Sequence, residues 1–146
     1  MASLRVFRDQ RGSAAAEFAL LLPVFALLVL GIFHFCALVY ASSSLHWAVE
    51  QAARCAAVSR LNTGLSCGTT TSTTEAYALQ IYKGPNIGLS AGSFTAQAVT
   101  DANGNTCRQV SGTGTYRIQT GLVNVDVPLS ASACFPAATT PTWAAS

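Results

Sequence analysis

A long apolar stretch lies near the start of the chain, and alternating apolar and polar positions appear only in the second half. From Phe18 to Tyr40 there are 23 consecutive residues without a formal charge. As an α-helix with about 1.5 Å rise per residue, this stretch reaches about 34 Å, enough to cross a hydrocarbon core of about 30 Å. The pattern predicts one membrane-spanning helix near the N-terminus.

Helical spacing continues beyond the apolar stretch. One stripe of small and apolar residues recurs at intervals of three and four: Leu45, Ala48, Ala52, Cys55 and Ala56. Glu50 and Arg54 stand four residues apart, away from this stripe, where they can pair. We therefore expect a single helix from about Ser13 to Arg60, ended by Asn62-Thr63-Gly64. Its first part faces lipid, and its second part packs against an exported domain.

Shorter patterns predict a second helix. Ser72 and Glu75 have the spacing of a capping box, a helix from Ala76 to Lys83 follows, and Gly84-Pro85 ends it.

Alternation then predicts a small antiparallel sheet. A first strand from about Phe94 leads to a hairpin turn at Asp101–Asn105. Gly112-Thr113-Gly114 is read as another turn. The remaining strands are expected at Thr106–Val110, Thr115–Thr120 and Leu122–Val127. A long helix, a short helix and a small antiparallel sheet make an α+β fold.

The basic residues give the orientation. Arg5, Arg8 and Arg11 precede the apolar stretch, against a single Asp9. Because positive charge stays on the cytoplasmic side, the N-terminus is expected inside and the residues after about Ser42 outside. The formal net charge is only +2, and no basic patch interleaved with aromatics indicates nucleic acid as a partner.

Four cysteines follow the apolar stretch, which suits an oxidising compartment. Four cysteines allow three pairings. We favour Cys55–Cys67 and Cys107–Cys134, because each pair joins neighbouring predicted elements. Cys36, inside the apolar stretch, is then a free thiol.

Constellations for catalysis or metal binding are missing. His34 lies in the apolar stretch and His46 lies off the helical stripe, while the acids Glu50, Glu75, Asp101 and Asp126 have no spacing typical of a carboxylate pair. The sequence therefore predicts no enzyme, no cofactor, no metal and no small-molecule substrate.

One motif stands at the head of the apolar stretch. Gly12, followed by Ser13-Ala14-Ala15-Ala16-Glu17, resembles the processing site of type IV pilin-like proteins. The resemblance implies that a prepilin peptidase cuts after Gly12, that Ser13 becomes the N-terminus and that Glu17 becomes the fifth residue. With Phe18–Pro23, Gly31-Ile32-Phe33 and the later Leu129–Pro136, the chain looks like the TadE-type pseudopilins of tight adherence (Tad/Flp) pilus systems. The choice between TadE-type and TadF-type subunits stays open.

The motif also has a physical interpretation. An unpaired carboxylate in lipid costs on the order of 2.5–3.5 kcal/mol, and Glu17 could avoid this cost by meeting the new α-amine of a neighbouring subunit. Such a contact would set the register between subunits. Alternatively, Glu17 merely sits at the cytoplasmic interface, near the positive end of its helix. Pro23 removes the hydrogen bond to the carbonyl of Ala19 and is expected to kink the helix.

These expectations divide the chain into five segments. They are a basic leader (1–12), a membrane span (13–41), an exported continuation of the helix (42–62), an extracytoplasmic α+β head (63–136) and a loose tail (137–146).

The function expected from the resemblance is structural: a minor pilin in assembly of a Tad/Flp-type pilus, held in the bacterial inner membrane with its head in the periplasm. The implied partners are the major pilin, a sister pseudopilin, the platform proteins and the prepilin peptidase. Two alternatives remain, a secreted disulfide-stapled binding module and a plain single-pass membrane anchor.

Overall fold

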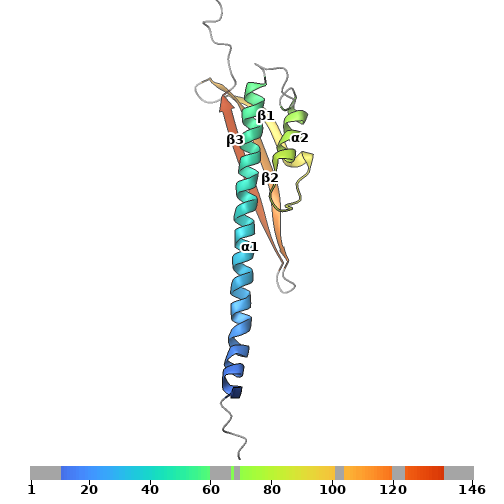
Figure 1. Ribbon diagram of the computed structural model, residues 1–146. Coiled ribbons are helices and arrows are strands. Elements are labelled where there is room, and N and C mark those ends of the chain that lie inside the picture. Colours follow the sequence, from blue (N-terminus) through green and yellow to red (C-terminus); the bar gives the residue numbers. More distant parts are fainter. Residues whose placement is uncertain (1–10, 60–66, 68–69, 101–103, 120–123, 137–146) are drawn as a thin grey trace, which may run out of the picture. The chain divides into compact units, whose positions relative to one another are not determined.

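A computed structural model of the chain describes residues 11–59, 67, 70–100, 104–119 and 124–136. The described residues form two compact units, one ending at Cys36 and the other, called the head below, beginning at Ala37. The elements, labelled in Figure 1, are α1 (Arg11–Val58), α2 (Thr71–Ile81), the 3-10 helix η2 (Ala91–Ser93), β1 (Phe94–Thr100), β2 (Thr106–Gln119) and β3 (Asn124–Pro136). The expected turn at Asn62–Gly64 and the tail from Ala137 lie outside the described residues.

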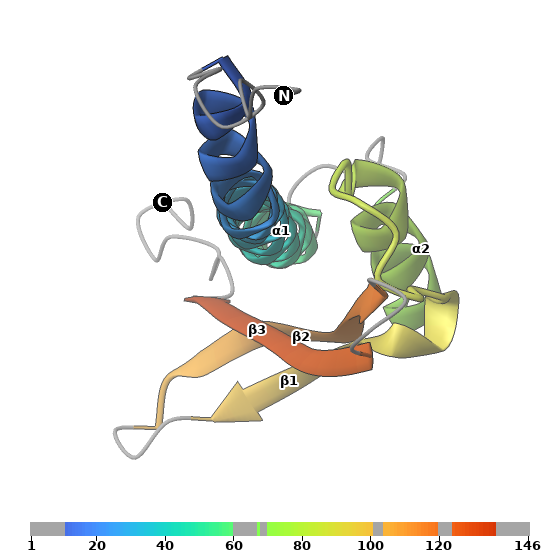
Figure 2. The same ribbon diagram turned by 90° about the horizontal axis from the view of Figure 1, so that it is seen from below.

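The α+β fold class is confirmed. The head contains one antiparallel sheet of three strands in the order β1-β2-β3. The C-terminal part of α1, from Ala37 onward, and α2 lie on the same face of this sheet (Figure 2). Along each strand, the side chains that point away from α1 and α2 form the other face of the sheet. This face is polar, as is usual for an antiparallel sheet with one solvated face.

The core of the head lies between α1 and the sheet. The predicted helical stripe is buried except for Cys55, which is half-buried. The fully or almost fully buried residues of the core cluster come from α1 (Ala41, Leu45, Val49, Ala52, Ala53), from α2 and the following loop (Ala78, Ile87) and from the strands (Phe94, Val110, Tyr116, Ala131). The α1 residues of this core are mainly alanines, and the larger Phe94 and Tyr116 of the strands fill the space between the helix and the sheet.

The expected turn at Gly112-Thr113-Gly114 is wrong. Strand β2 continues through it for 14 residues, and β3 pairs with β2 from Cys107 to Gln119. The two glycines serve close packing instead. A Cβ at Gly112 would lie 2.8 Å from Cε1 of Phe94 and 3.0 Å from Cγ2 of Val49, and one at Gly114 would lie 2.7 Å from Cδ1 of Ile87. A glycine inside a strand often marks such a close approach.

The start of the second helix also differs from the expectation. The N-cap is Thr70, whose side chain accepts from the N–H of Thr73 while the Thr73 hydroxyl accepts from the N–H of Thr70. Ser72 and Glu75 therefore do not form the capping box. The Glu75 carboxylate instead accepts from the backbone N–H of Ala96 on β1, at 3.3 Å. This contact ties α2 to the sheet.

Two disulfides join the elements of the head, in the pairing favoured from the sequence. Cys55 at the end of α1 bonds to Cys67, with 6.1 Å between Cα atoms, and Cys107 on β2 bonds to Cys134 on β3, with 5.7 Å. Cys36 is free and exposed. The predicted pair of Glu50 and Arg54 is present at 2.6 Å, with the Arg54 guanidinium 5.0 Å from the ring centroid of Phe135.

Candidate functional site

The residues of the pilin-like motif lie at the beginning of α1. The helix begins at Arg11, so Gly12 and Ser13 stand in its first turn. Glu17 is exposed and has no hydrogen-bond or ion-pair partner among the residues that the structure describes. The helix continues on both sides of Pro23. Whether Gly12 is processed, Glu17 pairs or Pro23 kinks the helix in lipid stays a prediction.

The helix surface beyond Glu17 is apolar and open. Every leucine and phenylalanine from Phe18 to Phe35 is at least half exposed, from 50% at Leu22 to 77% at Leu20. Among the described helices, α1 is the one long and apolar enough to cross a membrane, and its most apolar 18-residue window is 0% buried. Nothing else in the described chain covers this surface, and a large exposed apolar surface is typical of a membrane or protein interaction site.

In the head, a cluster of polar contacts fastens the loop after α2 to α1. The Tyr40 hydroxyl donates to the carbonyl of Lys83 at 3.1 Å, and the Lys83 N–H donates to Oγ of Ser44 at 3.3 Å. The neighbouring Tyr82 hydroxyl donates to the carbonyl of Pro85 at 2.7 Å. Burial, and to a smaller extent the nearby Tyr40, raises the pKa of Tyr82 above its ordinary value of 10.0. Local spacing does not indicate the two contacts between α1 and this loop, because they join residues about 40 positions apart.

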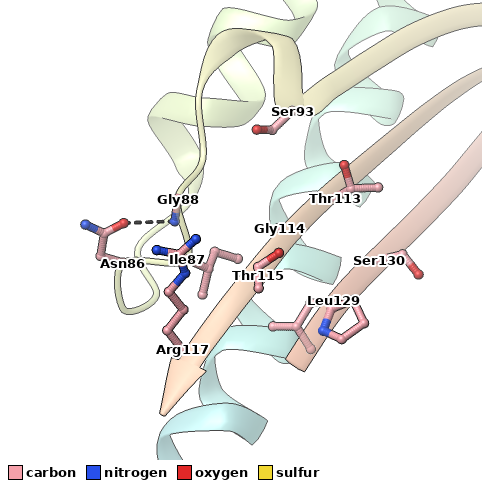
Figure 3. A pocket seen from close by; sticks show the side chains of 11 residues that line it. Asn86, Ile87, Gly88, Ser93, Thr113, Gly114, Thr115, Arg117, Leu129 and Ser130 are labelled. Carbon is pink, nitrogen blue, oxygen red and sulfur yellow. Dashed lines mark hydrogen bonds between the residues drawn. The ribbon is translucent and has the colours of Figure 1, made fainter. Parts of the chain in front are cut away.

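Figure 3 shows an open hollow of about 790 Å³ beside strands β2 and β3. Its floor is formed by β2 and β3, and its wall by the loop from Asn86 to Gly88 and by Ser93. The N–H of Thr115 donates to the carbonyl of Ile87 at 3.0 Å, which holds this loop against β2 beyond the end of β1. The hollow is lined by polar and apolar side chains: the hydroxyls of Ser93, Thr113, Thr115 and Ser130, the amide of Asn86, the guanidinium of Arg117, and the apolar Ile87, Pro128 and Leu129.

These groups do not make a catalytic arrangement. The charged pair beside the hollow joins Nε of Arg117 to Oδ1 of Asp126 at 3.5 Å, and both side chains are more than 60% exposed. The hollow contains no histidine or cysteine to act as a base or nucleophile. Across the described residues, no group of three or more His, Cys, Asp or Glu side chains is placed to hold a metal ion. The features with functional potential are therefore the exposed apolar helix and the motif at its start.

Comparison with known proteins singles out the same region. No curated protein and no solved structure matched the chain. The family model described as TadE-like protein matches residues 12–54, beginning at Gly12 and including Glu17, Pro23 and most of α1. This match confirms the resemblance predicted from the sequence, and it identifies residues 12–54 as a TadE-like segment, whose last part, from Ala37 onward, belongs to the disulfide-bonded α+β head.

Proposed function

We propose that this chain is a structural subunit that takes part in assembly of a Tad/Flp-type pilus from the bacterial inner membrane. One observation carries the proposal: the TadE-like match begins at Gly12 and runs along the exposed apolar surface of α1. TadE-like proteins are components of Tad pili and not a family of enzymes. A minor or priming role fits a chain whose head has its own core and disulfides.

Membrane anchoring is the first part of the proposal. Residues 13–41 span the membrane once, with the arginine-rich N-terminus in the cytoplasm and the head in the periplasm. The uncovered apolar surface supports the span, and the three arginines before it support the orientation. The two disulfides are consistent with an oxidising compartment for the head.

Assembly is the second part. A prepilin peptidase cuts between Gly12 and Ser13 and thereby frees the α-amine of Ser13. The carboxylate of Glu17 then meets the α-amine of a neighbouring pilin as the two helices come together. An ion pair in lipid removes much of the cost of placing a carboxylate there and defines the axial register. The neighbours are the major pilin and a sister pseudopilin, handled by the platform proteins.

The N-terminal residue of the mature protein tests the proposal. N-terminal sequencing of the membrane form from cells that contain the peptidase should find Ser13, and Gly12→Leu should leave the leader attached by crowding the peptidase site. Gly31→Leu is the matched control, because it adds the same side chain to the same helix with no atom within 4 Å of the new Cβ. A wild-type protein that starts at Met1 would indicate a plain membrane anchor, and one that starts near Ser42 would indicate a secreted module.

A further inference from the structure

The sheet of the head has two outer edges, and the described residues cover only one of them. At the edge formed by β1, the N–H of Ala96 donates to the carboxylate of Glu75 on α2 at 3.3 Å. Where β1 has ended, the loop at Ile87 lies beside β2 instead, and the Thr115 N–H donates to the Ile87 carbonyl (Figure 3). Strand β3 forms the opposite edge over 13 residues, and no described strand or loop pairs with its outer side.

The register shows which backbone groups lie at this outer side. Thr115 directs its N–H to Ile87, away from β3, so its partner Pro128 on β3 also directs its backbone groups away from β2. Every second residue of β3 shares this direction, and the next such position without an N–H is Pro136. The outward groups between the two prolines have no partner among the described residues, and they belong to Ser130, Ser132 and Cys134. We call this row of backbone groups the open edge.

The open edge lacks the features that usually protect an edge strand from pairing. Such strands carry lysines, inward-pointing charges or bulges, or another element covers them. Val127–Pro136 contains no charged residue, and the four residues in its middle, Ser130–Ala133, all have small side chains. Pro128 and Pro136 limit the open edge at its two ends and leave its middle available. An uncharged strand of this kind accepts a further strand through main-chain hydrogen bonds.

Positive charge stands at one end of the open edge. The Arg54 guanidinium lies 5.0 Å from the ring centroid of Phe135 and pairs with Glu50. Arg108, which lies opposite Phe135 on β2, is half-buried and has no ion-pair partner among the described residues. Two arginines next to Phe135 thus stand against one carboxylate. An acidic side chain on a strand added beside β3 would complement this excess of positive charge.

A second copy of the chain does not fit the open edge. Antiparallel pairing of two β3 strands relates the heads by a two-fold axis perpendicular to the strands, so the parts of α1 within the two heads run in opposite directions. Ala37, where each head begins, would then stand at opposite ends of the pair, although each head continues into a span of the same membrane. Parallel pairing of two copies at one level puts each outward N–H opposite the same N–H of the other copy. The added strand therefore comes from a different subunit.

We propose that the open edge of β3 binds an uncharged strand from the exported head of the sister pseudopilin, with an acidic residue of that strand beside Phe135. Among the proposed partners, the sister pseudopilin is the one expected to have a head of the same kind. The inference rests on the assembly role proposed above and names the surface through which the head takes part in it. The sheet of one head would then continue into the sheet of the next.

Amide hydrogen exchange on the full-length protein tests the proposal. The protein is purified alone and as the complex with the co-expressed sister pseudopilin, and exchange is resolved residue by residue with fragmentation mass spectrometry. In the protein alone, the outward N–H groups of Ser130 and Ser132 should exchange quickly, whereas those of Ala131 and Ala133, which face β2, should exchange slowly. In the complex, the outward N–H groups of Ser130, Ser132 and Cys134 should slow by at least about tenfold.

Proline substitutions at outward positions give the matched pair of variants. Ser132→Pro removes the central N–H of the open edge and no hydrogen bond to β2, so it should weaken the complex by at least about tenfold. Asn124→Pro removes an outward N–H outside the open edge, at the first residue of β3, and should leave binding unchanged. Disulfide mapping and unfolding midpoints near those of the wild type show that both heads are folded. Arg108→Gln should weaken the complex about twofold to fivefold and reduce its sensitivity to salt.

Several results would overturn the proposal. They are the lack of a complex, a complex in which the open edge exchanges as quickly as in the protein alone, and undiminished binding by the Ser132→Pro protein. Slow exchange of the open edge in the protein alone would also overturn it, and the mass of the particle would then show whether a second copy covers the edge. The N-terminal residue separates the two levels of inference. A protein that starts at Ser13 and binds its partners with a rapidly exchanging edge keeps the assembly role and loses only this contact.

Discussion

Helix α1 contains two apolar regions with opposite surroundings. Before Cys36 the large side chains are exposed, with Phe18 at 66% and Leu28 at 56% of their surface. In the head, Leu45 and Val49 are buried, with 0% and 1% of their surface exposed. The residue sizes differ accordingly. The first region is rich in leucine and phenylalanine, and the second presents alanines to the sheet. An apolar sequence therefore does not determine the surroundings of a helix, because among the residues that the structure describes only the second region is covered by other elements.

The difference separates stability from assembly. The first region contributes nothing visible to the core of the head, so changes there should alter membrane and subunit contacts and leave the head folded. Changes at the α1–sheet contact should do the opposite. The following predictions would break this separation if they failed.

The largest effect is expected at Glu17. Glu17→Gln keeps the shape of the side chain and removes its charge, which makes insertion of a lone helix easier if anything. Synthesis, cleavage and disulfide formation should stay normal. Association with partner pilins should be lost, because the neighbour's buried amine no longer has a counter-charge. Co-purification with the major pilin and a count of surface pili measure the loss.

Glu50→Gln is the matched control for this experiment. Glu50 also lies on α1, but it pairs with Arg54 at the exposed surface of the head, where an ion pair contributes little. Wild-type association and pilus counts in the Glu17→Gln protein would show that Glu17 is an ordinary interfacial charge.

The next largest effect concerns the disulfides of the head. Replacing Cys107 and Cys134 together by alanine should cost about 2–5 kcal/mol in the free energy of unfolding, since a small core depends on such links. Cys36→Ala, which removes the free cysteine of the first region, should leave the unfolding midpoint nearly unchanged. Chemical unfolding of the detergent-solubilised protein, followed by near-ultraviolet circular dichroism, measures both. Peptide mapping without reduction checks the pairing, and a Cys67–Cys107 crosslink would contradict it.

A smaller effect is expected at Gly112, where β2 packs against Phe94 and against Val49 of α1. Gly112→Ala places a methyl group 2.8 Å from Phe94, and such overpacking should cost about 1–3 kcal/mol. At Gly92, a new Cβ meets no atom within 4 Å, so Gly92→Ala should be neutral or slightly stabilising. The denaturation midpoint of the Gly112→Ala protein should therefore be lower than that of the Gly92→Ala protein. Equal midpoints would mean that the contact between α1 and β2 is looser than described.

Glycine in β2 also shows where sequence reasoning failed. The helices, the alternation near Phe94, the disulfide pairs and the TadE-like motif could be predicted, because spacing or charge along the chain encodes them. Gly112 and Gly114 look like turn residues locally. Glycine is needed there because Val49 and Ile87, from distant segments of the chain, pack against these positions. The Thr70 cap was missed for a related reason. Several hydroxyls in one run can cap the helix, and the contact of Glu75 with Ala96 decides among them.

The candidate site divides in the same way. Gly12, Glu17 and Pro23 are predicted from a local motif and stay predictions; the family match begins at the first of them. The contacts that hold the loop after α2 on α1 were not predicted, because they join residues about 40 positions apart.

The smallest effect is expected at Tyr82, in the loop that Tyr40 and Ser44 fasten to α1. Burial first, and then the nearby Tyr40, raises the pKa of Tyr82, so the folded head favours the neutral phenol, which donates to the carbonyl of Pro85. The head should therefore have its full stability below pH 10, the ordinary pKa, and lose part of it as the pH rises from there through the raised pKa.

Tyr82→Phe should remove this alkaline loss at the expense of one hydrogen bond at every pH. Tyr40→Phe should only reduce it, because Tyr40 is the lesser cause of the shift. Unfolding midpoints measured across the alkaline range, alongside phenolate absorbance, would show the order wild type, Tyr40→Phe, Tyr82→Phe in steepness. An equally steep decline in all three proteins would mean that the loop is not held against α1 in solution. The contrast between the head, which packs on its own part of α1, and the exposed part of α1, which does not, would then not extend to this loop.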